Sequence, residues 1–146
     1  MKNVARNVWQ IDGFPPNAIN AYLVGDILID GGTKLDVRRF LKALKGIDLK
    51  LVALTHCHPD HQGAVKAVCE KFSVPLACHE LDRAAMEGRA PMVPEGRMIR
   101  ISGRLLSGPP HNVDRVLTDG EMIRPLRVIH ARGHTPCHWM VTPPST

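Results

Sequence analysis

One stretch, Leu51–Gly63 (LVALTHCHPDHQG), constrains this chain more than any other part of its sequence. Its apolar opening predicts a buried strand, and a cluster of histidines follows the strand directly. Side chains two positions apart on an extended backbone point to the same side. His56 and His58 can therefore reach one metal ion, while Cys57 points away from it. Neutral imidazoles are typical zinc ligands, so the strand end predicts a metal site.

A second pair of possible ligands comes immediately after the first. Pro59 bends the chain, and a helix that starts at Asp60 and His61 places both side chains one turn beyond the first pair. Imidazole and carboxylate together suit zinc, and also iron or manganese. The alternative for Asp60 is a structural one, in which its carboxylate caps the helix through the backbone of Gly63 and Ala64.

The rest of the chain alternates between strand-like and helix-like segments, which predicts an α/β layered fold. Two apolar runs meet at Gly25-Asp26, which indicates a β-hairpin. Residues 33–46 repeat apolar side chains at helical spacing, Leu35 and Phe40 among them, with Thr33 as a possible cap. Further segments are expected as follows: strands within 7–11, 48–56, 73–80, 114–123 and 125–133, helices within 63–72 and 80–88, and a surface insertion over 89–113 with a short helix near 98–106.

Composition excludes several classes of protein. The chain has 146 residues, 44% of them hydrophobic and 23% charged, which is typical of a globular chain and predicts a single domain over residues 1–146. The net charge is +5, but no block of basic residues and few aromatic residues accompany it, so nucleic-acid binding is not expected. No membrane span or signal peptide is apparent, and the cytoplasm is the expected location. The four cysteines form no CxxC pair and are expected to be free thiols.

The histidine cluster and two other segments resemble a known family. THCHPDHQG resembles the T-H-x-H-x-D-H-x-G signature of the metallo-β-lactamase fold. NAYLVGDILIDGG resembles the N-terminal hairpin of that family, with Asp30 as its terminal aspartate. VIHARGHTPCH resembles the second family motif, G-H-T-P-G-H, and would supply a third histidine, His134. The resemblance covers nearly the whole chain, from about Val8 to His138.

This resemblance implies an αββα sandwich and the glyoxalase II-like branch of metallo-hydrolases. His56, His58 and His134 would hold a first zinc ion, and Asp60 and His61 would contribute to a second, with iron or manganese as other possible metals. A metal-bound hydroxide would cleave an ester, thioester or lactam-type bond of a small-molecule substrate. Asp60 would orient that nucleophile and pass a proton to the leaving group.

The sequence departs from the family pattern in three places. Arg132 stands where the family usually has proline, and Cys137 stands where it has glycine. No aspartate or histidine follows His138, and no further strand or helix is expected in Trp139–Thr146, so the chain resembles a family member that lacks its C-terminal half. Three alternatives follow: a truncated product, a mononuclear hydrolase that pairs with a second copy to cover the gap, and a metal-binding remnant or interaction protein without catalysis. An iron oxygenase of the same family ranks below these.

The other singled-out residues are expected to have structural roles. His79 is predicted to be a polar residue at a strand end, and His111 a loop residue that could meet a substrate. His130 is expected to pack near its strand end, and His138 to support the second motif. Asp30 is predicted to accept backbone hydrogen bonds near the site.

Overall fold

A computed structural model describes residues 1–16, 18–91, 103, 105–123, 126–131 and 139–142 of the chain. Strands and helices alternate along them, as the sequence predicts. The strands are β1 Lys2–Ala5, β2 Val8–Asp12, β3 Asn20–Val24, β4 Ile27–Ile29, β5 Leu51–Ala53, β6 Leu76–His79, β7 Arg115–Leu117, β8 Met122–Ile123, β9 Leu126–His130 and β10 Trp139–Thr142. The helices are the 3-10 turn η1 Lys34–Asp36, α1 Val37–Ala43, α2 Pro59–Gln62, α3 Val65–Phe72 and α4 Glu80–Met86.

The larger sheet in the described residues runs in sequence order from β1 to β7. Strands β1 to β4 are antiparallel neighbours, and the predicted hairpin at Gly25-Asp26 is confirmed by the pairing of β3 with β4. Strands β4 to β7 are parallel. Parallel strands end at the same edge of a sheet, so residues that follow β4, β5 and β6 meet at that edge.

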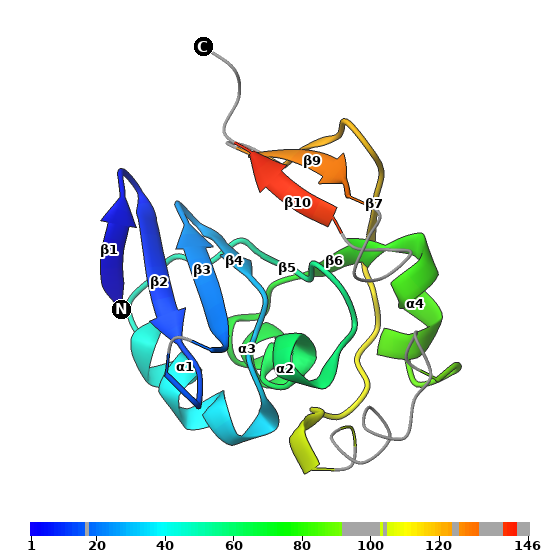
Figure 1. Cartoon of the computed structure of the whole chain (residues 1–146), viewed down its shortest axis with the longest axis horizontal. Helices are drawn as coiled ribbons and strands as arrows, with labels where there is room; N and C mark the ends of the chain where they lie inside the picture. Colours follow the sequence, from blue (N-terminus) through cyan, green and yellow to red (C-terminus); the bar gives the residue numbers. More distant parts are fainter. Residues whose placement is uncertain (17, 92–102, 104, 124–125, 132–138, 143–146) are drawn as a thin grey trace.

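Two apolar cores lie on opposite faces of the larger sheet. One core joins the sheet to α1, α3 and α4, with Phe40, Val68 and Met86 among its buried residues. The other joins the sheet to the smaller sheet, where Ala53 and Ala77 meet Val128 of β9. The described residues thus form three layers, helices, sheet and sheet, and Figure 1 shows β9 and β10 lying apart from α1, α2 and α3. None of the helices among these residues is long and apolar enough to cross a membrane.

The smaller sheet corrects one expectation. Its order is β10-β9-β8, and Trp139–Thr142, where no strand is expected, pairs antiparallel with β9. Four residues are too few for the alternation of apolar and polar side chains to predict a strand. The segment becomes a strand because the edge of β9 offers backbone N–H and C=O groups for pairing. Most of the helix expected near 98–106, namely residues 98–102 and 104, lies outside the described part of the chain.

The helix expected over residues 33–46 also differs in its first turn. Residues 34–36 form a 3-10 turn, and α1 starts only at Val37. The Asp36 carboxylate is buried and accepts hydrogen bonds from the backbone N and Oγ1 of Thr33 at 3.1 and 2.7 Å. Leu35 therefore lies outside the core and is 68% exposed, whereas Phe40 is fully buried as expected.

Helix α2 packs unusually closely against the loop that follows β4. The backbone N of Gly31 donates to the carbonyl of His61 at 2.6 Å, and the backbone N of Gly63 donates to Gly32 at 2.7 Å. A Cβ built on Gly63 would lie 2.0 Å from the carbonyl carbon of Thr33, which no real contact allows. Only glycine at position 63 lets the two backbones approach this far, and this approach brings α2 to the ends of β4 and β5.

We expect Gly63→Ala to lower the free energy of unfolding by about 3 kcal/mol, the upper part of the usual cost of overpacking. Gly46→Ala is the matched control, because Gly46 has a φ of +83° but open space around it. The control should cost only about 1 kcal/mol through its left-handed backbone. Urea unfolding curves measure both, and equal losses in the two variants would contradict the close-approach explanation.

Candidate metal centre

The candidate metal centre begins where β5 ends, at the carboxyl edge of the parallel strands. His56 and His58 are almost completely buried, 2% and 7% exposed. The Nε2 atom of His56 lies 3.1 Å from the Nδ1 atom of His58, and the two rings meet edge to face. Two nitrogens bound tetrahedrally to one zinc ion at about 2.0–2.1 Å are about 3.3 Å apart. The two imidazoles therefore fit a shared metal ion with little movement.

Asp60 and His61 lie in α2, beside the first pair. The ring centroids of His61 and His56 are 4.0 Å apart, and Nε2 of His61 lies 3.5 Å from Oδ2 of Asp60. The residue at the cap position of α2 is His58, and Pro59 is its first residue. The capping alternative for Asp60 is therefore wrong, because Asp60 already lies inside the helix. Its side chain is 44% exposed and remains available to a ligand.

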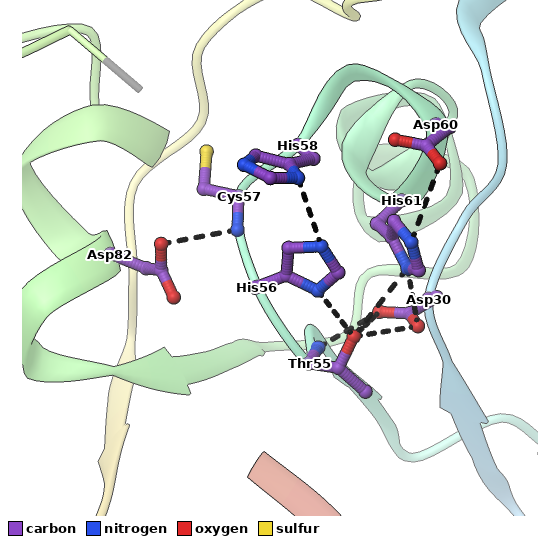
Figure 2. Close-up of polar contacts among 8 residues, drawn as sticks. All are labelled: Asp30, Thr55, His56, Cys57, His58, Asp60, His61 and Asp82. Carbon is purple, nitrogen blue, oxygen red and sulfur yellow. Dashed lines mark hydrogen bonds and ion pairs between the residues drawn. The ribbon is translucent and has the colours of Figure 1, made fainter. Parts of the chain in front are cut away.

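A carboxylate and a hydroxyl below the histidines hold the cluster together, as Figure 2 shows. Thr55 Oγ1 lies 2.8 Å from Oδ2 of Asp30 and 3.1 Å from Nδ1 of His56. A hydroxyl has one hydrogen, and an ionised carboxylate can only accept, so Thr55 donates to Asp30 and accepts from His56. Nδ1 of His61 lies 2.9 Å from Oδ2 of Asp30 and donates to it. Both histidines then carry their hydrogen on Nδ1, which leaves each Nε2 with a lone pair for a metal.

Asp30 occupies this position through an unusual backbone conformation. Its φ is +63°, and its backbone N donates to the carbonyl of Ala53 at 3.0 Å. The carboxylate also accepts the backbone N–H of Thr55 at 2.8 Å. The predicted role of Asp30 as an acceptor of backbone hydrogen bonds is confirmed. Its bond to His61 is a contact that the sequence analysis missed, since the two residues are far apart in the chain.

The environment of His61 favours its protonated form in the metal-free chain. Burial lowers the pKa of His61, but the hydrogen bond and the negative charge of Asp30 outweigh burial, and the charge of Asp60 adds to them. The resulting pKa is above the ordinary value for histidine. A proton and a metal ion thus compete for the same Nε2 atom.

The Cys57 side chain lies across the backbone from the His56 ring, as the alternation predicts. It is buried in the core between the sheet and the helices. The backbone N of Cys57 donates to Oδ1 of Asp82 in α4 at 3.1 Å. Asp82 is a second residue that sequence reasoning missed, and it fixes the backbone between the two histidines.

The third predicted ligand, His134, lies outside the described residues, as do Arg132, Cys137 and His138. Among the residues that the structure describes, no group of three or more histidine, cysteine, aspartate or glutamate side chains is placed to hold a metal ion. The pair His56 and His58 needs at least one further ligand, so the ligand roles of the five predicted residues remain predictions.

Comparison with known proteins identifies the family. The sequence profile of the metallo-beta-lactamase superfamily matches residues 14–146. The chain belongs to the metallo-beta-lactamase superfamily. It is 29% identical over 129 residues to the probable metallo-hydrolase YqgX of Bacillus subtilis (strain 168), which covers 77% of this chain and 60% of that protein. The chain thus spans less than two thirds of the length of this curated relative.

Solved structures of the superfamily confirm the predicted fold. BJP-1, a subclass B3 metallo-beta-lactamase of Bradyrhizobium japonicum, superimposes with a TM-score of 0.75 at 21% identity, over 99% of this chain and 57% of that one. TTHA1623, solved in a di-iron-bound form, gives a TM-score of 0.70 at 29% identity, over 93% of this chain and 67% of that one. The expected metallo-β-lactamase architecture is therefore correct.

The raised pKa of His61 has a consequence for stability. Histidine in the unfolded chain has a pKa near 6.5, and the pKa of His61 in the folded chain is higher. Protonation of His61 therefore stabilises the folded chain, and this contribution is complete below about pH 6.5. This contribution is lost as the pH rises through the folded-state value. We expect the free energy of unfolding of chelator-treated wild-type protein to fall as the pH rises above about 6.5. The His61→Asn variant should lack this contribution to the dependence of the unfolding free energy on pH. Urea unfolding across this range measures the effect, and identical slopes for the two proteins would refute it.

Proposed function

We propose that this chain is a zinc-dependent hydrolase that cleaves an ester, thioester or lactam-type bond of a small molecule. His56, His58 and His134 would bind the first zinc ion, and Asp60 and His61 would contribute to a second. The observation that carries the proposal is the convergence of His56 Nε2 and His58 Nδ1 at 3.1 Å. Membership of the superfamily and likeness to a probable metallo-hydrolase of Bacillus subtilis support the same reaction class.

The choice of zinc rests on the donor set. Imidazole and carboxylate suit zinc, but also iron, and TTHA1623 holds two iron ions. When bound, the metal supplies a water of lowered pKa and polarises a carbonyl oxygen. Asp60, whose side chain is 44% exposed beside His61, would accept a proton from the attacking water and return it to the leaving group. Asp30 cannot take this role, because it is buried and its oxygens hold Thr55 and His61.

His56→Ala should abolish metal binding and any hydrolysis. It removes one of the two converging nitrogens, and no neighbouring side chain would replace that nitrogen as a ligand. Elemental mass spectrometry of the purified variant measures metal per chain, and thioester, lactone and chromogenic β-lactam substrates measure activity. His111→Ala is the control for metal content, because it removes a histidine from outside the cluster and should leave the metal in place. Hydrolysis that survives His56→Ala would refute the assignment. Folded wild-type protein without metal would favour the non-catalytic alternative.

Thr55→Val should weaken zinc binding by about 10- to 100-fold, the usual effect of removing a group that orients a metal ligand. Valine keeps the shape of threonine but cannot accept the hydrogen of His56 or donate to Asp30. Competition with a chromogenic chelator measures the affinity. The matched control is Thr118→Val, because the hydroxyl of Thr118 contacts the partly buried carboxylate of Glu121, outside the cluster. Unchanged affinity in Thr55→Val would show that the hydroxyl does not fix the tautomer.

A further inference from the structure

A cavity of about 240 Å³ lies between α2 and α4, close to the candidate metal centre. Its third wall is the segment that leads to β7, which Figure 1 shows passing between these two helices. The residues that line it include Cys57, Gln62, Ala85, Met86, Gly108 and Pro110. None of the proposed metal ligands in the described part of the chain lines it, although two wall residues, Cys57 and Gln62, are next to such ligands in sequence. The cavity is therefore a separate site.

Backbone contacts on both sides hold the third wall away from the space. The backbone N of His111 donates to the carbonyl of Met86 at 3.0 Å, which ties the segment to α4. On the side of α2, a Cβ built on Gly108 would lie 2.1 Å from the carbonyl oxygen of Gly63, so the two backbones touch directly. Between these contacts, residues 109–110 are both proline, which restricts the backbone. The segment is thus kept from folding into the cavity, whereas most protein interiors are closely packed.

Gln62 places a polar side chain in the wall. It is only 3% exposed, and its Oε1 is buried without a hydrogen-bond partner among the described residues. Its Nε2 donates to the carbonyl of Gly108 at 3.4 Å, which is long for such a bond, so the amide loses little when it turns. A buried oxygen without a donor costs free energy. A molecule in the cavity that carries an O–H or N–H group would supply the missing donor once the amide turns toward it.

The size and the lining of the cavity indicate the class of molecule. Pockets for drug-sized ligands measure about 300–1,000 Å³, whereas an apolar cavity of about 150 Å³ holds benzene. A volume of about 240 Å³ therefore suits a molecule with a single ring. No charged residue is among the described residues that line it, so the ligand is neutral. Ala85, Met86 and Pro110 offer apolar contacts, and Gln62 offers one acceptor.

We propose that this cavity binds a small neutral molecule of about the size of phenol, with an apolar body and one hydrogen-bond donor. The donor bonds to Oε1 of Gln62, and the body lies against Ala85, Met86 and Pro110. Binding at this site requires neither a metal ion nor hydrolysis, so the inference goes beyond the proposed function and stands independently of it.

The test uses phenol and toluene, two probes of nearly the same shape, of which only phenol has a donor. NMR titration of the isotope-labelled protein gives both affinities for wild type and for Gln62→Met. Methionine has the length of glutamine but only a weak sulfur acceptor. We expect the ratio of phenol affinity to toluene affinity to fall about tenfold in Gln62→Met, as the loss of one hydrogen bond requires. The ratio, unlike either affinity alone, is insensitive to a general change in the shape of the cavity.

A second pair of variants locates the bound probe. Ala85→Leu fills the cavity with a larger side chain and should abolish the binding of both probes. Ala84→Leu is the matched control, because Ala84 lies in the same helix but is not among the residues that line the cavity. This control should bind phenol and toluene as wild type does.

Other results would overturn the proposal. An unchanged ratio in Gln62→Met would show that Gln62 is not the partner of the donor. Folded wild-type protein without saturable phenol binding would show that the cavity holds only water. Phenol binding that survives in Ala85→Leu would place the probe elsewhere. If Ala85→Leu does not fold, nuclear Overhauser effects between phenol and the methyl group of Met86 in wild-type protein make the same test, and their absence has the same meaning. None of these results bears on the proposed hydrolase, because no measurement uses its metal or substrate.

Discussion

The contact between the Asp30 carboxylate and Thr55 is the interaction on which the candidate site depends. It joins the ends of two parallel strands through both the backbone N–H and the hydroxyl of Thr55. The same two residues receive the Nδ1 hydrogens of His56 and His61, so one buried charge fixes two imidazoles. Without an acceptor below them, these rings could adopt either tautomer, and Nε2 would not be reserved for a metal.

This arrangement is possible only because α2 lies against the loop after β4. Asp30 reaches His61 because the backbones of Gly31 and Gly32 bond to α2 at 2.6 and 2.7 Å, and Gly63 leaves room for that approach. The positive φ of Asp30 then turns its carboxylate toward the strand end. Stability and the site are therefore coupled here. A larger residue at position 63 would move the helix that carries Asp60 and His61, although Gly63 itself has no side chain that could bind a metal ion or transfer a proton.

The sequence allowed the fold and the cluster to be predicted, because both follow from local patterns. Alternation, turn residues and the HxHxDH spacing act over a few residues, and the hairpin, the alternation of strands with helices, and the pairing of His56 with His58 follow from them. The remaining features are contacts between distant segments. Asp30 with His61, Cys57 with Asp82, and His79 with His130 depend on strand register and on helix docking, which spacing does not encode. Leu35 was misassigned because the Thr33–Asp36 turn, held by a buried carboxylate, overrides helical periodicity.

Charge explains why such a site needs a buried carboxylate that is not itself a ligand. Asp30 stabilises positive charge at His61, and a proton and a metal dication both supply that charge. Raising the basicity of Nε2 therefore strengthens proton binding and metal binding together, and the pH decides which one prevails. In acid the proton occupies His61 and the folded chain gains stability without metal. As the pH rises through the raised pKa of His61, the proton leaves, and a metal ion in its place would best compensate the negative charge of Asp30.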